Sequence, residues 1–370
     1  MARKGDAEIT ASPNFLSVLL YSLRSYIGPR HDSAESPALG LCVSKLPQVL
    51  AWRYNLFMHT SAFFKLFPPP KFLSMKHAGL DISDDAIRCI EYDSGPHGLF
   101  IKKFASVPIP AGQIDGGDIK DEKAVSALLG KFDHDNDLTY VKVSLPEEKA
   151  YLFQTDVPST DVKAVTQHVE FKLEENVPLS ATDAVFYFDL LPKAVTGGTL
   201  RASVSVVPRT YVEHFISVLN VAGIFPVAFE IVPKSIAKAI IPEHMDDAVM
   251  IVHSMAHKTG IYIVSGGVVC FTSTISSVDA AALSTEIDRV YTYWMSHGIA
   301  TSAVKHISLV GRGAPAFEIA IKHSAAVPAG LSVSVGDVWK NAFDTNHYIP
   351  PISKDDSLDY AVAAGLAMVN

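Results

Sequence analysis

The sequence predicts an α/β fold built from two halves that repeat one plan. Each half opens with three strand-like runs separated by short polar turns, and strand and helix units follow each opening. The first opening runs from His77 to Pro110, and the second from about Asp246 to Ile275. Such a repeat of plan predicts two similar α/β domains in one chain.

Composition limits the classes of function. The chain has 370 residues and a net charge of −8, which argues against binding nucleic acid, because phosphate contacts need a basic face. No apolar run reaches the roughly 18–20 residues that span a bilayer; the best candidate, Phe15–Leu23, is about half that long and is interrupted by serines. The three cysteines, Cys42, Cys89 and Cys270, form no CxxC pair and indicate reduced thiols in a cytoplasm.

Residues 1–75 differ from the rest and are expected to be an N-terminal extension. Their apolar runs alternate with Gly, Pro, Ser and Arg without a lasting period. Two interpretations stay open: a loosely ordered arm, or an upstream stretch translated from a start codon assigned too early, with Met58 the true start. Pro68–Pro70 must be extended.

In the first half, the runs HAGLDIS, AIRCIEYD and GLFIKKFASVPIP predict an antiparallel meander. A Gly- and Asp-rich loop and a helix over about 122–132 come next. The strand TYVKVSL follows, and then the strand KAYLFQTDV.

A helix with a clear start then follows. Ser159, Thr160 and Asp161 offer N-caps, Val165, Val169 and Leu173 recur at helical spacing, and Pro178 ends the run. Beyond it we expect the strands AVFYFDLLP, ASVSVVP and PVAFEIV and the helices TYVEHFISVLNVAG, with Gly223 at its C-cap, and PKSIAKAII.

In the second half, VMIVHS, GIYIVSGG and VVCFTSTI predict another meander. In the helix that follows, Ile287, Val290, Tyr291 and Trp294 form one apolar face, expected in the core. The strand HISLV, the loop GRGAP, the helix AFEIAIKH, the loop IPPIS and an apolar closing helix complete the chain. This layout is that of the actin-like ATPase fold.

Three phrases carry a resemblance to a known family: EFKLEENVPLS at 170–180, SVVPRTYVEHFISVLNVAG at 205–223, and YIPPISKDDSLDYAVAAGLAM at 348–368. Over roughly residues 58–370 the chain resembles the PilM family of type IV pilus assembly proteins, relatives of the bacterial division protein FtsA. FKLFPPPKFLSM, before the first strand, also resembles some members and favours a start near Met58.

The resemblance implies a domain plan and a partner. It implies a first actin-like domain from 76–145, 202–245 and 346–370, an inserted α+β subdomain at 146–201, and a second domain at 246–345. It also implies that the cytoplasmic tail of a PilN-like inner-membrane protein binds between the first domain and its insert, and so recruits a cytoplasmic protein to the inner face of the membrane.

The resemblance places the phosphates of ATP, with Mg²⁺, between two turns. In the first turn, Asp81 would hold Mg²⁺ through water, and Ser83 and Asp84 would approach phosphate. Ser83 stands where the family has Gly, which crowds that approach. An ordinary hairpin turn is the alternative.

The second turn departs further from the family pattern. His253 replaces an Asp and Met255 replaces a Gly, while Lys258, Thr259 and Gly260 remain as candidate nucleotide ligands. Losing one interaction with the charge that develops in the transition state raises the activation free energy by about 2.7–4 kcal/mol. Two such losses mean that efficient ATP hydrolysis is not expected. The segment before HISLV also looks shorter than in the family, which would trim any lid over the cleft.

Further motifs are weaker. His253 and His257 lie four apart without a third ligand, so we expect no metal site there. Gly311 and Gly313, in a loop late in the chain, fit an adenosine loop, a plain strand–helix turn or a dinucleotide fingerprint; we expect no clean βαβ unit around them. The end of the insert helix is expected either to contact the partner or to pack on its own sheet: Glu175, Asn176, Val177, Pro178 and Leu179.

The sequence therefore favours an adaptor of pilus assembly with weak or lost ATP binding. Two alternatives stay open: an active ATPase or sugar kinase of the same fold, and an FtsA-like division protein that forms filaments. The apolar, uncharged C-terminus AVAAGLAMVN indicates a buried helix and not a membrane-binding one.

Overall fold

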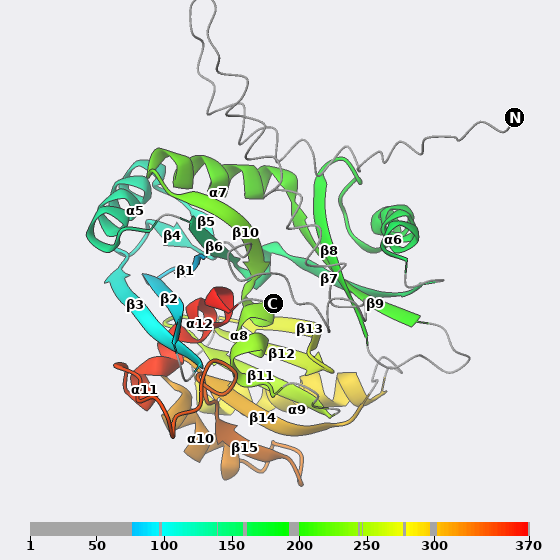
Figure 1. The fold of residues 1–370 in the computed structure, drawn as a ribbon. Helices are drawn as coiled ribbons and strands as arrows, with labels where there is room; N and C mark the ends of the chain where they lie inside the picture. Colours follow the sequence, from blue (N-terminus) through cyan, green and yellow to red (C-terminus); the bar gives the residue numbers. More distant parts are fainter. Residues whose placement is uncertain are drawn as a thin grey trace, which may run out of the picture. The chain divides into compact units, whose positions relative to one another are not determined.

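A computed structural model describes residues 76–368, apart from 96–97, 139, 158–160, 192–199, 243–244, 246, 277–278 and 297–301. The expected extension, residues 1–75 with Met58, lies outside the described residues. Within them, two five-stranded mixed sheets and one three-stranded sheet form the frame of the protein (Figure 1).

The first large sheet has the strand order β10-β6-β1-β2-β3. β1, β2 and β3 form the antiparallel meander, and β6 and β10 extend it in parallel beyond β1. Their bounds are β1 Ala78–Ile82, β2 Ala86–Gly95, β3 Gly98–Pro108, β6 Tyr140–Leu145 and β10 Phe225–Ile231.

The second large sheet repeats this plan, strand for strand, in the order β13-β12-β11-β14-β15. Again an antiparallel meander, β11 to β13, is followed by two parallel strands. The bounds are β11 Ala248–Ser254, β12 Thr259–Ser265, β13 Val268–Ile275, β14 Val304–Val310 and β15 Ser332–Val335. The predicted repeat of plan is therefore confirmed at the level of strand order and direction.

Helices connect the strands within each sheet, and one helix leads from the first sheet to the second. Those within the sheets are α5 Glu122–Asn136, α7 Arg209–Val221, α9 Ala280–Ser296 and α10 Ala314–Lys322, and α8 Val232–Ile240 leads from β10 to β11. On α9 the predicted apolar face is buried, with Ile287 and Trp294 both 0% exposed. α9 is the connecting helix among the described residues between β13 and β14.

Two short pairings were not expected. The Gly- and Asp-rich loop contains a hairpin of β4 Ile114–Asp115 and β5 Asp118–Ile119, turned by Gly116 and Gly117. Both glycines have positive φ, 56° and 78°, which a two-residue turn of this type requires. The second was β15, whose four residues SVSV give too short an alternation to mark a strand.

The insert has its own sheet and core. Its strands β7 Tyr151–Val157, β9 Leu200–Pro208 and β8 Ala184–Leu190 pair antiparallel in that order, and β9 runs past the expected boundary at 201. Helix α6, Val162–Asn176, begins at Asp161, whose side chain accepts from the Ala164 amide. Val165, Val169 and Leu173 are fully buried against this sheet, as their spacing predicts.

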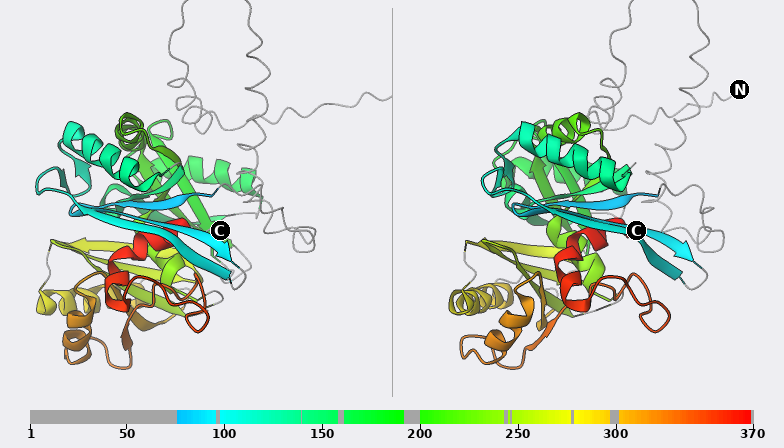
Figure 2. Two further views of the ribbon diagram at one scale, coloured as in Figure 1. Left: turned by 60° about the vertical axis from the view of Figure 1, so that its left-hand side comes forward. Right: turned by 90° about the vertical axis from the view of Figure 1, so that its left-hand side faces the viewer.

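The chain closes with α11 Lys354–Ser357, a 3₁₀ turn at Leu358–Tyr360, and α12 Ala361–Ala367. α12 lies between the two large sheets, against β1 and α8 (Figure 2). A Cβ at Gly365 would lie 1.7 Å from the Ser235 carbonyl oxygen, so this close crossing needs glycine. None of the helices in the described part of the chain is long and apolar enough to cross a bilayer.

Candidate functional site

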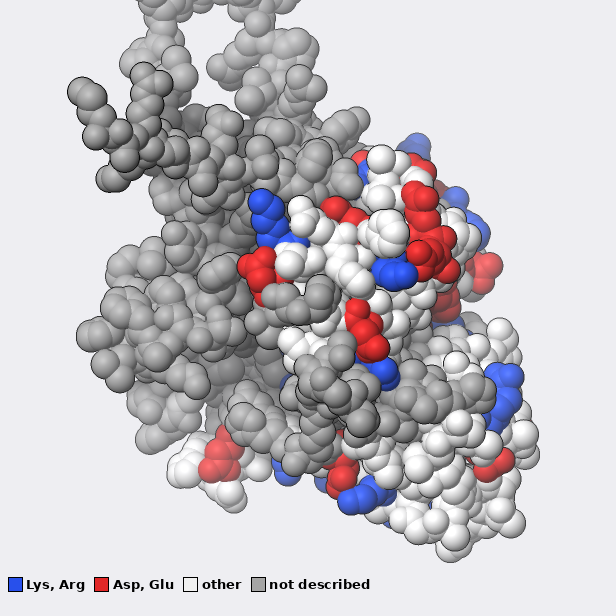
Figure 3. Space-filling model, turned by 90° about the vertical axis from the view of Figure 1, so that its right-hand side faces the viewer, with Lys and Arg blue, Asp and Glu red and all other residues white. Residues whose placement is uncertain are grey.

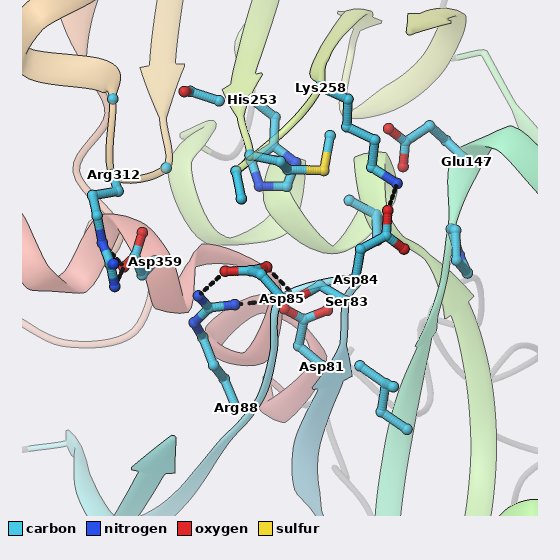
Figure 4. A pocket seen from close by; sticks show the side chains of 18 of the residues that line it. Asp81, Ser83, Asp84, Asp85, Arg88, Glu147, His253, Lys258, Arg312 and Asp359 are labelled. Atoms are coloured by element: carbon cyan, nitrogen blue, oxygen red, sulfur yellow. Dashed lines mark hydrogen bonds and ion pairs between the residues drawn. The ribbon is translucent and has the colours of Figure 1, made fainter. Parts of the chain in front are cut away.

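A cleft of about 110 Å³ opens where the ends of β1, β6, β11 and β14 meet (Figure 4). Both turns singled out in the sequence line it, as does the loop after β14. Among the described residues, six acidic and three cationic side chains line it: Asp81, Asp84, Asp85, Glu147, Glu148 and Asp359, with Arg88, Lys258 and Arg312.

The first turn is held by its own side chains. Ser83 donates from its hydroxyl to Asp85 at 2.8 Å, and its amide bonds the Ala86 carbonyl oxygen at 3.0 Å. Arg88 pairs with Asp85 at 3.1 Å and donates to the Ser83 hydroxyl at 3.3 Å. The Ser83 hydroxyl therefore serves the turn itself.

Asp81 lies at the end of β1 with 4% of its surface exposed. Its Oδ1 accepts a hydrogen bond from Ser144 Oγ at 2.8 Å. Burial raises the pKa of Asp81 to about 6, against the opposing charge of Arg88. A carboxyl group so desolvated is a poorer partner for hydrated Mg²⁺ than an ionised, open one.

The second turn brings His253 and Met255 to the cleft wall, where the sequence placed them. Burial, with the charges of Arg88 and Lys258, lowers the pKa of His253 to about 3, so its ring is neutral. Its Nδ1 lies 3.4 Å from the Tyr262 hydroxyl. A neutral ring, and not a carboxylate, therefore lines the cleft at this turn.

Lys258 extends from this turn toward the first half of the chain. Its Nζ lies 2.9 Å from Asp84 Oδ2 and also bonds Glu148 Oε1. The other Asp84 oxygen accepts from the Gly117 amide at 2.9 Å, in the β4–β5 hairpin. Burial alone would lower the pKa of Lys258, but Glu148 and Asp84 raise it. The ammonium group therefore stays charged between two carboxylates.

Glu147 was missed by sequence reasoning. It follows β6 and is 5% exposed, and its Oε1 accepts from Tyr262 at 2.7 Å and from Thr274 at 3.2 Å. Burial, then the neighbouring Glu148, raises the pKa of Glu147 to about 7. The only signal was two acidic residues directly after a buried strand, in LPEEK.

Thr259 and Gly260, both predicted nucleotide ligands, lie in β12 behind the cleft wall. Thr259 is fully buried. A Cβ at Gly260 would lie 2.0 Å from the Tyr262 hydroxyl oxygen, so the glycine makes room for the bond from Tyr262 to Glu147.

The loop with Gly311 and Gly313 turns between β14 and α10 against the end of β11. A Cβ at Gly311 would lie 2.0 Å from the Ser254 carbonyl oxygen, and one at Gly313 2.5 Å from the Ser254 hydroxyl oxygen. Arg312 pairs with Asp359 at 2.7 Å. Contrary to expectation, the loop belongs to a βαβ unit, because β15 pairs parallel to β14 after α10.

The candidate partner residues divide into two groups. Val177 is 5% exposed in the core of the insert, and Leu179 packs against that core. Glu175 pairs with Lys172 at 2.8 Å, Asn176 caps the Lys172 carbonyl at 2.8 Å, and Pro178 is exposed. Glu175, Asn176 and Pro178 are thus accessible, whereas Val177 is used internally.

The cleft can do little phosphate chemistry as it stands. Each of its three cations is already paired with a carboxylate, and its volume is below the roughly 300–1,000 Å³ of small-molecule sites. Among the described residues, no group of three or more His, Cys, Asp or Glu side chains is placed to hold a metal ion. Because Asp81 is desolvated, His253 is neutral and Lys258 is paired, the residues present do not fit ATP with Mg²⁺.

No protein-family model matches the chain, and no curated protein matches it. Among solved structures, the PilM–PilN type IV pilus biogenesis complex is similar, with a TM-score of 0.65 and 17% identity over 79% of this chain and 98% of that one. The cytoplasmic domain of EpsL, from the type II secretion system of Vibrio cholerae, has a TM-score of 0.40 and 12% identity over 64% of this chain and 82% of that one.

A Bacteroides thetaiotaomicron protein with an actin-like ATPase fold and unknown function has a TM-score of 0.41 and 10% identity over 74% of this chain and 93% of that one. The resemblance predicted from the sequence is confirmed for the fold, which is the actin-like ATPase fold in the arrangement that PilM has.

Proposed function

We propose that this protein is a cytoplasmic adaptor of type IV pilus assembly, which binds the cytoplasmic tail of a PilN-like inner-membrane protein. One observation carries the proposal: the likeness extends over 98% of the matched chain of the PilM–PilN type IV pilus biogenesis complex. A membrane role then needs no membrane helix in this chain, because the tail would bring it to the inner face of the membrane.

Two sheet edges support tail binding at the junction of the first domain and its insert. β10 ends the first sheet and β8 ends the insert sheet, so each has one strand neighbour among the described residues (Figure 1). Lys234, two residues into α8, pairs with Asp189 of β8 at 2.7 Å. An extended peptide can add to such an edge through main-chain hydrogen bonds.

Exposed aromatic side chains lie on the same two strands. Tyr187 of β8 is 40% exposed and Phe225 of β10 is 44% exposed. Among the described residues on the face shown in Figure 3, acidic and basic side chains both occur and lie among uncharged ones. We therefore expect apolar and main-chain contacts, and not one broad charged field, to supply most of the affinity.

Loss of the nucleotide requirement is part of the proposal. His253 is neutral, Met255 lines the cleft, and Lys258 is paired, so the second turn offers no group ready for phosphate. The ATPase alternative would need the opposite arrangement, with ionised carboxylates and unpaired cations. No contact among the described residues favours it or a filament-forming role.

A calorimetric titration with the N-terminal tail peptide of the host's PilN-like protein tests the proposal. We expect binding, with an affinity that Mg-ATP leaves unchanged. Tyr187→Ala should weaken binding about fivefold or more, because a contacting aromatic supplies much of such an interface. Ile319→Ala, 67% exposed on α10, is the control and should bind normally. Absence of binding would exclude the adaptor function.

A further inference from the structure

Among the described residues lining the cleft, Lys258 is the cation that joins the second turn both to the first turn and to the turn after β6. It comes from the turn between β11 and β12, whereas Asp84 follows β1 and Glu148 follows β6. The side chain of Lys258 is 14% exposed, and those of Asp84 and Glu148 are each 21% exposed. Its ammonium group is thus largely shielded from water, where charge pairs are screened little.

A second contact reinforces the first. Tyr262 of β12 and Thr274 of β13 donate to Glu147, the residue before Glu148. The 3₁₀ turn at Glu147–Lys149 is therefore held from the second half by three side chains, and Lys258 alone among them also reaches the first turn.

The remaining cations of the cleft cannot take this role. Arg88 is 3.1 Å from Asp85, on its own hairpin. Arg312 pairs with Asp359 of the closing segment at 2.7 Å, and not with the first turn or the turn after β6. Removing Lys258 would leave the partly shielded carboxylates of Asp84 and Glu148 near each other without the cation that now pairs with both, and like charges repel.

We propose that Lys258 is a built-in counter-ion that closes the cleft without nucleotide or metal, by bridging the first turn and the turn after β6. The cation that a metal–nucleotide complex would bring is supplied by the chain itself. This extends the proposed loss of nucleotide dependence, and it holds the two halves in one arrangement for partner binding. It rests on contacts within the cleft and not on any partner.

Hydrogen exchange on the full chain, without peptide or nucleotide, tests the proposal. In Lys258→Met, the amides of residues 81–86 and 145–149 should exchange about tenfold faster or more, because the variant loses charge-assisted hydrogen bonds that hold both segments. Lys258→Arg, which keeps the charge, should exchange more slowly than the Met variant. Lys305→Met is the matched control, since its pair with Asp247 at 3.0 Å is on the surface.

A cycle with Asp84→Asn separates the bridge from general loosening. If the bridge acts as proposed, Lys258→Met should increase the exchange rate of the amides of 145–149 by a smaller factor in the Asp84→Asn background than in the unaltered protein. Unchanged exchange in Lys258→Met, or full additivity with Asp84→Asn, would overturn the proposal. Neither outcome depends on whether a PilN-like tail binds, so the adaptor function is judged separately.

Discussion

Glu147 is an acid whose ionisation is opposed by its surroundings. In the folded protein its pKa rises from 4.5 to about 7, through burial and then the charge of Glu148. Since the folded state holds this proton more tightly than the unfolded state, its contribution to stability is greatest at low pH. That contribution is lost as the pH rises from about 4.5 to about 7.

Glu147→Gln should remove this dependence while keeping an oxygen for Tyr262 and Thr274. Relative to the unaltered protein, the variant should gain on the order of 2–3 kcal/mol in free energy of unfolding between pH 4.5 and pH 8. Urea unfolding at several pH values measures the difference. Glu175→Gln, at the exposed end of α6, is the control. A Glu147→Gln difference that stays constant with pH would contradict the assigned shift.

Individual site residues could be predicted only in part. Asp81, His253 and Met255 stood out because a turn pattern places them, and they do line the cleft. Lys258 pairs with Asp84 and Glu148, which are more than a hundred positions away in the sequence. A local sequence pattern cannot predict a contact between such distant positions. For Val177 the sequence left open a contact with the partner or packing on its own sheet, and the choice depends on β9, which follows later and shares its core.

The insert helix α6 separates buried from exposed positions within one turn. Leu173 is 0% exposed, and Phe171, two residues earlier, is 73% exposed. Leu173→Ala should cost about 2–5 kcal/mol through lost burial and the cavity left behind. Phe171→Ala, the matched control, should change stability by no more than about 0.5 kcal/mol. Hydrogen exchange of α6 measures both, and equal effects would mean that the helix packs differently.

The closing helix α12 depends on close approach to its neighbours. Gly365 meets the Ser235 carbonyl, and Gly79 of β1 meets Ala363 of α12 in the same way, since a Cβ added at Gly79 would lie 2.1 Å from the Ala363 carbonyl oxygen. Gly365→Val should destabilise by about 1–3 kcal/mol or more, since backbone must move. Thermal unfolding measures this. The control is Ala326→Val, which adds a similar side chain in an exposed loop. Gly330→Val would not serve, because Gly330 has positive φ and valine would strain the backbone there.

Long elements with a strong period were predictable and short ones were not. The meanders, α6 and α9 have apolar residues at strand or helix spacing, and these determine which face is buried. β15, β4 and β5 are only two to four residues long, and their existence depends on the neighbours that they pair with. The βαβ unit around Gly311 was missed for this reason, because it needs β15.

The repeated sheet order of the whole chain could be inferred because each half carries its own meander. The state of the cleft between the halves could not, because it depends on which charges meet across them. In a cleft with each cation paired, bound nucleotide must first break pairs such as Lys258 with Asp84. Whatever free energy that costs is subtracted from nucleotide affinity.

Mg-ATP should therefore barely stabilise the protein. A ligand present at a concentration equal to its dissociation constant adds only about 0.4 kcal/mol to the free energy of unfolding. If the dissociation constant of Mg-ATP is about 1 mM or weaker, roughly 1 mM Mg-ATP should raise the unfolding temperature by no more than about 1 °C. Removing divalent ions with a chelator should likewise leave it unchanged. Because coupling is reciprocal, a nucleotide that does not favour one state of the cleft cannot alter the affinity for a tail peptide. A rise of about 5 °C or more would show a cleft that still binds ATP, and would require Lys258 to leave Asp84 and Glu148 when it does.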